Sequence, residues 1–390
     1  MLNLSNKNRS GRPRSVTFCS RSYTYRRVCY DLPVHGYRFA YARTIPVRRI
    51  LRTSSFWNST RLFFPRARRL VHTFNDIAIN ADAWMISYEL ELPRFLKDTA
   101  DWHLRAAFDR LADARCRLIL PMSDAARQWF LRRVPEELRT TCMSKMRVFT
   151  GGVEGPEHFG LRCTPHPREA NQQIHLVFVG NDAFRKGGLF VLDAFDSLRR
   201  NGVDAKLTFI GSVTPRTYVT QVQRQDRLQM LDRLKTTKHV TWVPGCSNRA
   251  ILTALVDADI GLLPTLDDSL GWSVIEMMAS CTPVIASNVV ALPELIENGT
   301  TGRLLSIPRD EDRRWVGIRD ANMRPEHLSY AHQLLVDGLV AAISTLYRDE
   351  DQRMQMAYQS RYRYEKRYTP EVAARQLRVL YDEVYECPVV

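Results

Sequence analysis

Two acidic residues, Asp268 and Glu276, flank the start of a short apolar segment in the stretch LPTLDDSLGWSVIEMMASCTPVIAS, residues 263–287. The segment predicts a helix that begins near Gly271, where free N–H groups and the helix dipole attract an anion such as phosphate. A carboxylate does not bind phosphate directly, but it accepts hydrogen bonds from neutral hydroxyl groups. This spacing therefore predicts one short element that holds a diphosphate, a ribose and a sugar together.

A basic pair, Arg185 and Lys186, occurs in the stretch VGNDAFRKGG, residues 179–188. These two cations can neutralise a diphosphate, and the glycines that follow leave room for it. The stretch is neither a Walker loop nor a G-x-G-x-x-G loop, because it lacks both patterns. Alone, a basic pair before a helix is more often solvated, so it indicates an anion site only in combination with the acidic stretch.

Apolar runs alternate with helical periodicity from about residue 173 onward. This alternation predicts a parallel, doubly wound sheet, whose ligands bind at the carboxyl ends of the strands. Three predicted strands end there in glycine, at Gly180, Gly211 and Gly245. The predicted strands are 174–180, 205–211, 239–245, 259–265, 283–287 and 301–305, and the predicted helices are 188–202, 218–237, 247–258 and 272–280.

A length of 390 residues favours two domains. The first half predicts a smaller α/β domain, and residues 327–385 predict helices with charged faces. We expect a basic segment at 1–70, a first domain at 71–170, a second at 171–365, and a last helix at 366–390 that crosses back to the first. In the first domain we expect strands at 69–75, 83–89, 116–123 and 145–151, with helices at 94–114 and 124–133.

The net charge of +14 resides in residues 1–70, which are rich in arginine and contain one acidic residue, Asp31. Such a segment suits an anionic membrane surface, an acidic glycan or a nucleic acid. A tail without structure, a targeting presequence in residues 1–30 or a coding bias explains it equally well.

No run of eighteen apolar residues and no secretory signal occurs. The eight cysteines are scattered and form no C-x-x-C pair, which favours buried thiols in a reducing compartment and disfavours a zinc site.

The second half resembles the retaining family four of the nucleotide-sugar glycosyltransferases (glycosyl transferases group 1), which have the GT-B fold. The family's G-x5-K-G motif is similar to Gly180–Gly187, and its E-x7-E motif is similar to Asp268–Glu276. Its continuation resembles EMMASCTPVIA, residues 276–286, and its closing run resembles residues 291–305. The resemblance covers about residues 173–305. It implies an α/β fold class with two Rossmann-like domains facing a cleft, followed by a C-terminal helical tail.

The resemblance also implies roles for individual residues. Lys186, with Arg185, would bind the donor diphosphate, Glu276 the ribose hydroxyls and Asp268 the transferred sugar. No metal and no cofactor would be needed, because the nucleotide-diphosphate sugar is a co-substrate and the helix dipole and cations replace a metal ion. The implied donor-binding set is Gly180, Asn181, Arg185, Lys186, Gly187, Ser269, Leu270, Gly271 and Trp272.

The chain departs from the family pattern at three places. Asp268 replaces a glutamate and is one methylene shorter, and Asn181 occupies the place of an arginine that Arg185 would then substitute. Residues 1–70 offer no glycine-rich loop. For the catalytic histidine of the first domain, the candidates are His72 and, by position only, Glu89. For either residue a structural hydrogen bond or an exposed position is about twice as probable as catalysis.

These features predict a metal-independent hexosyltransferase that moves a sugar to a glycan or lipid-linked acceptor with retention of configuration, as in polysaccharide biosynthesis. We expect it in the cytoplasm, peripheral to the inner membrane face through residues 1–70, with nucleic acid disfavoured as a partner. One alternative is a catalytically eroded nucleotide-sugar-binding or scaffold protein whose basic arm contacts lipid or nucleic acid. Another is a synthase or phosphorylase of the same fold that associates with no membrane.

Overall fold

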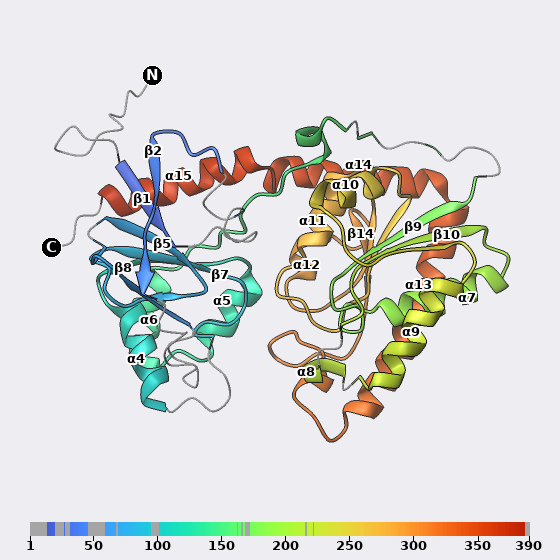
Figure 1. Cartoon of the computed structure of the whole chain (residues 1–390), viewed down its shortest axis with the longest axis horizontal. Coiled ribbons are helices and arrows are strands. Elements are labelled where there is room, and N and C mark those ends of the chain that lie inside the picture. Colours follow the sequence, from blue (N-terminus) through green and yellow to red (C-terminus); the bar gives the residue numbers. More distant parts are fainter. Residues whose placement is uncertain are drawn as a thin grey trace. The chain divides into compact units, whose positions relative to one another are not determined.

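The computed structural model describes residues 14–19, 27, 32–45, 59–67, 69–94, 101–161, 163–164, 167, 172–214, 217–220 and 222–386. The chain divides into two compact α/β units, each with a parallel sheet (Figure 1). The first unit is Met1–Gly152 with Pro370–Val390, and the second is Val153–Thr369. The predicted α/β class is confirmed, and the first boundary lies at Gly152 where residue 170 was expected.

The second unit contains a six-stranded, all-parallel sheet in the order β11-β10-β9-β12-β13-β14. Its central strands are buried and mainly apolar, as expected for a sheet covered on both faces; the polar exceptions are His175 and Ser287. All six strands occur where the sequence predicts them. They are β9 (Ile174–Val179), β10 (Ala205–Ile210), β11 (Val240–Val243), β12 (Ile260–Leu263), β13 (Val284–Ser287) and β14 (Gly302–Leu305).

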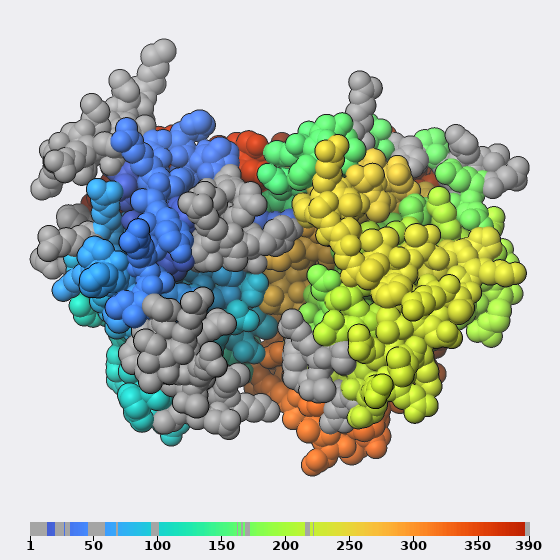
Figure 2. All heavy atoms as spheres, in the orientation of Figure 1, coloured from blue at the N-terminus to red at the C-terminus, as the bar shows by residue number. Residues whose placement is uncertain are grey.

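Helices cover both faces of this sheet. On one face α13 packs along α7, with α9 beside β11; on the other, α11 contacts α10 and α14 (Figure 1). On the face shown in Figure 2, green and yellow residues from β10 to α10 form much of the surface of this unit. Residues 224–229 at the start of α9 are exposed. The helices are α7 (Gly188–Arg200), α8 (Thr217–Thr220), α9 (Arg224–Thr236), α10 (Asn248–Val256), α11 (Trp272–Ala279), α12 (Leu292–Leu295), α13 (Arg324–Arg348) and α14 (Glu350–Arg367).

The strand order of the second sheet reverses between β9 and β12. From β9 the chain proceeds outward to β10 and β11, then returns to β12 on the other side of β9 and proceeds to β13 and β14. Because β9 and β12 are hydrogen-bonded neighbours, the loops at their carboxyl ends emerge side by side. Such a switch point is where open α/β sheets bind their ligands.

The first unit contains a five-stranded parallel sheet in the order β2-β1-β5-β7-β8 and a small sheet of β3, β4 and β6. The strands are β1 (Arg14–Phe18), β2 (Tyr37–Tyr41), β3 (Thr44–Ile45), β4 (Thr60–Phe63), β5 (Leu70–Phe74), β6 (Ile77–Ala78), β7 (Trp84–Tyr88) and β8 (Cys116–Pro121). The helices are α4 (Asp101–Ala112), α5 (Asp124–Leu131), α6 (Glu136–Ser144) and α15 (Pro370–Glu386).

The basic segment contributes directly to the first unit, because β1 and β2 lie inside residues 1–70. The Arg14 guanidinium pairs with the Asp382 carboxylate of α15 at 2.5 Å, and the Tyr37 hydroxyl donates to the same carboxylate at 2.7 Å. Arg61 pairs with Asp76 at 2.8 Å. Part of the positive charge is therefore neutralised within the unit.

Two predicted elements differ from the structure. Residues 145–151, expected as a strand, exchange hydrogen bonds with Ile119 of β8 but make only one isolated bridge, Ile119↔Met146. The predicted helix 218–237 is divided into α8 and α9, because Gln223 caps the start of α9 and its N–H donates to Asp226 at 2.8 Å.

Among the described residues, no helix combines the length and apolar character needed to cross a membrane.

Candidate functional site

The candidate site lies at the switch point of the second sheet. The loop after β9, residues 180–187, carries the predicted basic pair, and the loop after β12, residues 264–271, carries the first predicted acid. The two loops are in direct contact, because the Leu266 N–H donates to the Arg185 carbonyl at 2.9 Å. Residues about eighty positions apart in sequence are thereby brought together at one sheet edge.

Lys186 points at the acidic loop, where its ammonium group donates to the Asp268 carboxylate. The two side chains are only 14% and 9% exposed. Burial lowers the pKa of Lys186, and the negative charge of Asp268 opposes that shift. The structure therefore holds a cation and an anion together in a largely dehydrated position.

Glycines in the same loop leave room for Lys186. A Cβ at Gly180 would lie 2.7 Å from the Lys186 Cβ, so the lysine stem packs directly on the Gly180 backbone. Gly187 has a φ of +84° and approaches the Pro264 carbonyl so closely that a Cβ would lie 2.0 Å from its oxygen. Both glycines of the predicted motif are thus explained by close packing and backbone conformation.

Arg185 connects the two loops. Its guanidinium donates to the Asp182 carboxylate at 2.9 Å and to the Asp267 carbonyl at 2.6 Å, while its own carbonyl accepts from Thr265 Oγ1 at 3.1 Å. With these groups engaged inside the protein, the contacts favour a role in holding the loops together. A direct bond to a diphosphate stays a prediction.

Sequence reasoning missed a buried ion pair made by Asp267, the residue before Asp268. The Arg314 guanidinium makes two hydrogen bonds to the Asp267 carboxylate, at 3.2 and 2.9 Å, and the two side chains are 13% and 8% exposed. Arg314 is itself fixed by Asp310, which accepts from the Arg314 backbone N–H at 2.9 Å. The charged loop before α13 therefore holds the acidic loop in place.

Helix α11 begins beside these loops. Gly271, with a φ of +93°, precedes the helix, and a Cβ there would lie 2.4 Å from Leu292 Cδ2. Leu270 is buried, whereas Ser269 and Trp272 are partly exposed. The helix dipole places partial positive charge at this end, which gives it a preference for an anion.

Glu276 lies in the second turn of α11 and is buried. Burial, together with the nearby Glu276 carboxylate, raises the pKa of the Cys246 thiol. Cys246 follows Gly245 in the loop after β11, so this third strand end also lies within electrostatic reach of α11. Asn181 is exposed, and its side-chain oxygen accepts from the Ser212 N–H at 3.4 Å.

The two candidates from the first domain, His72 and Glu89, lie in the other unit. His72 is fully buried and makes hydrogen bonds to Tyr381 of α15 at 3.0 Å and to Ser87 at 2.8 Å. Burial lowers its pKa to about 3. These contacts favour a role in attaching α15 to the sheet. Glu89 lies 3.7 Å from Arg94 in a partly exposed ion pair.

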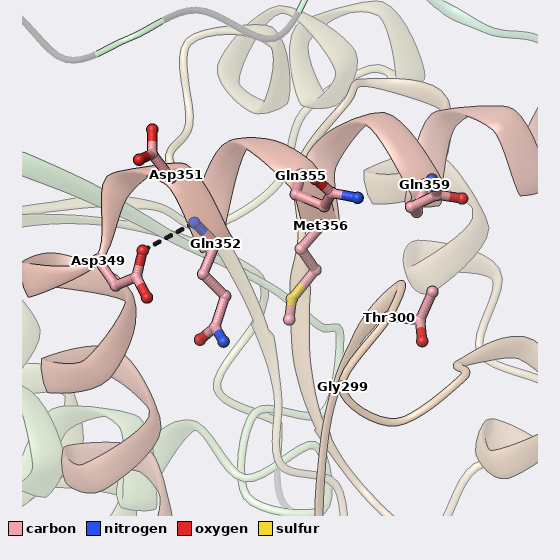
Figure 3. A pocket seen from close by; sticks show the side chains of 8 residues that line it. All are labelled: Gly299, Thr300, Asp349, Asp351, Gln352, Gln355, Met356 and Gln359. Carbon is pink, nitrogen blue, oxygen red and sulfur yellow. Dashed lines mark hydrogen bonds between the residues drawn. The ribbon is translucent and has the colours of Figure 1, made fainter.

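A pocket of about 580 Å³ lies elsewhere in the second unit, between the start of α14 and the turn before β14 (Figure 3). Its lining includes two carboxylates, Asp349 and Asp351, and no lysine, arginine or aromatic residue. A diphosphate would be repelled there, so this pocket does not compete with the switch point as the anion site. It is lined by Gly299, Thr300, Asp349, Asp351, Gln352, Gln355, Met356 and Gln359.

Two parallel-sheet units with a C-terminal helix that belongs to the first unit form the GT-B glycosyltransferase fold. The Anabaena protein HepE, solved in complex with UDP-glucose, has this fold and aligns with a TM-score of 0.56 and 13% identity over 93% of this chain and 98% of its own. Residues 165–315 match the family model of glycosyl transferases group 1.

Two curated relatives each match part of this chain. Glycogen synthase of Mycobacterium tuberculosis is 30% identical over 135 residues, which is 35% of this chain and 30% of the relative. The MMP alpha-(1->4)-mannosyltransferase of Mycolicibacterium hassiacum is 26% identical over 191 residues, 46% of this chain and 44% of the relative. The matches cover less than half the length of either relative.

Proposed function

We propose that this protein is a glycosyltransferase that takes a hexose from a nucleoside-diphosphate sugar bound at the switch point of the second unit. The observation that carries the proposal is the contact between Lys186 and Asp268. A cation and the acid that we expect to bind the sugar come from neighbouring strand ends and meet beside the first turn of α11. The match of residues 165–315 to the group 1 family model supports the same function.

Each part of the site would serve one part of the donor. Lys186 and the N–H groups that open α11 would stabilise the negative charge that develops on the departing diphosphate. Glu276 would accept hydrogen bonds from ribose hydroxyls, and Asp268 from hydroxyls of the sugar. Stabilisation by these groups would make a metal ion unnecessary, which we retain as part of the proposal.

The relatives support a hexose donor. HepE binds UDP-glucose, and the curated relatives are a glycogen synthase and a mannosyltransferase. We accordingly propose transfer to a glycan or lipid-linked acceptor with retention of configuration, as part of polysaccharide biosynthesis. We further propose a cytoplasmic protein that reaches an anionic membrane surface through residues 1–70. Transfer to acceptors in liposomes and in solution, compared side by side, tests this last point.

The first test measures donor binding and donor turnover in Lys186→Ala. Lys235→Ala is the matched control, because Lys235 is an exposed lysine on α9 in the same unit. Calorimetry with UDP and a panel of nucleotide sugars gives binding, and release of the nucleoside diphosphate gives turnover. We expect Lys186→Ala to lose about 100-fold in turnover while the control keeps wild-type rates.

Glu276→Gln separates binding of the nucleoside from chemistry at the sugar. It keeps the size of the side chain but removes the charge that would accept hydrogen bonds from the ribose hydroxyls. We therefore expect weaker binding of both the sugar donor and the free nucleotide.

Turnover of Lys186→Ala at the wild-type rate would refute the site. Nucleotide binding by the wild type without hydrolysis or transfer would instead support a nucleotide-sugar-binding or scaffold protein.

A further inference from the structure

Two cysteines outside the candidate site, Cys163 and Cys281, lie with their sulfur atoms 2.8 Å apart. Both belong to the second unit and are 118 positions apart in sequence. Cys163 is partly exposed and precedes β9, whereas Cys281 is buried in the turn between α11 and β13. Neither thiol has a part in the proposed transfer reaction.

The backbone at Cys281 is in the left-handed region, with a φ of +56°. This region is unfavourable for a residue with a Cβ, and glycine is the usual occupant. The turn is nevertheless well tied, since the Thr282 N–H donates to the Met277 carbonyl at 3.0 Å and Thr282 Oγ1 to the Leu255 carbonyl at 2.8 Å. Residues kept in unfavourable backbone regions concentrate at functional positions.

A cation from α14 lies near the pair. The Arg361 guanidinium donates to the Ala279 carbonyl at the end of α11 and pairs with Glu157 at 2.7 Å and Glu365 at 2.8 Å. The hydrogen bond that Cys163 donates, and then the charge of Arg361, lower the pKa of Cys281 against the opposing effects of burial and the two glutamates. The same contact raises the pKa of Cys163. Of the two thiols, Cys281 is therefore the one that ionises more readily, and the thiolate is the reactive form of a cysteine.

We propose that Cys163 and Cys281 are an oxidation site, which a peroxide converts into an intramolecular disulfide. The Cys281 thiolate attacks one peroxide oxygen, the O–O bond breaks, and the released hydroxide takes the proton that Cys281 gave up. The Cys163 sulfur then loses its proton and attacks the sulfenic sulfur of Cys281, and the displaced hydroxide leaves as water. Two thiols and one hydrogen peroxide become one disulfide and two water molecules.

This bond would join the segment before β9 to the end of α11, the helix that carries Glu276. It would close a loop of more than one hundred residues and so restrict the unfolded chain. In a reducing compartment the thiols would stay reduced until peroxide rises, and a dithiol would restore them. The proposal does not depend on the proposed transferase function.

The test treats the reduced full-length protein with hydrogen peroxide, blocks the remaining thiols and digests it with trypsin. Cleavage isolates the two cysteines in peptides 163–168 and 250–303, each with a single cysteine. We expect a linked pair of these peptides by mass spectrometry. We also expect a rise of about 5 °C or more in the unfolding temperature, reversed by dithiothreitol.

Two variants make the result specific. Cys163→Ser and Cys281→Gly should each lose both the linked peptide and the temperature rise. Glycine is chosen at position 281 because the backbone there is in the left-handed region. Cys246→Ser, which removes an exposed thiol, should keep both. Oxidation of Cys246 without linkage of the pair, or an equal temperature rise in Cys163→Ser, would overturn the proposal.

Discussion

The ion pair between Asp267 and Arg314 gives a sharp test of how the site is held. We consider Arg314→Met, which keeps most of the apolar stem and removes the guanidinium. The Asp267 carboxylate, whose side chain is 8% exposed in the wild type, would lose two hydrogen bonds, at 3.2 and 2.9 Å. Asp267, the residue directly before Asp268, would then carry a buried negative charge without the Arg314 guanidinium.

Removing one partner of a buried ion pair leaves a buried charge without compensation and costs roughly 3–5 kcal/mol. Because the Arg314 side chain is 13% exposed, water can replace part of the lost interaction, and we expect a loss near the lower end, about 3 kcal/mol. Urea unfolding of wild type and variant, followed by circular dichroism, measures the change. Titration with a nucleoside-diphosphate sugar should show weaker binding as the acidic loop relaxes.

The neighbouring residue provides the control. Arg313 pairs with Glu294 at 3.2 Å and its side chain is 39% exposed, so Arg313→Met should cost less than about 1 kcal/mol. The double variant Arg314→Met with Asp267→Asn removes both charges and should recover part of the lost stability. Equal effects of Arg313→Met and Arg314→Met on stability and donor binding would refute the reasoning.

Two further predictions concern backbone conformation and pH. Gly271→Ala, at a φ of +93°, should lose about 1–2 kcal/mol of stability and also donor affinity. The control Gly202→Ala, at a φ of +79° with open space around it, should lose stability alone. Equal donor binding by the two variants would contradict this prediction. Burial lowers the pKa of His72 to about 3, below the unfolded value of 6.5. Between these two pH values the folded state binds fewer protons than the unfolded state, so stability should fall as the pH drops from about 6.5 toward 3. His72→Asn should flatten that dependence in unfolding temperatures measured across this range, and an unchanged slope would count against it.

The fold of the second unit could be predicted from the sequence because its physical signals are local. Strands such as β9 and β12 are mainly apolar runs, buried on both faces, and each is followed by a glycine or proline that ends it. The helices between them have an amphipathic period and local caps, as at Ser247, whose side chain accepts from the Ala250 N–H. Neither signal depends on distant residues.

The first unit was harder because its strands contain charged and aromatic residues. Strand β2 reads YRFAY and has no fully buried residue, so its pattern does not stand out as a strand. Its stability depends on α15, where Tyr37 meets Asp382 and packs against Tyr381, more than three hundred residues away in sequence. A window along the sequence contains none of these partners.

The same distinction applies inside the candidate site. A motif names residues that are close in sequence, such as Lys186 with Gly187 or Asp268 with Glu276, and these are the groups expected to touch a ligand. The groups that fix them come from elsewhere: Arg314 is 47 positions beyond Asp267 and lies in a loop with several other arginines. Among so many charged residues, sequence alone gives no reason to choose that one. What distinguishes it is burial, which makes its pairing costly to break, and burial is a property of the folded unit.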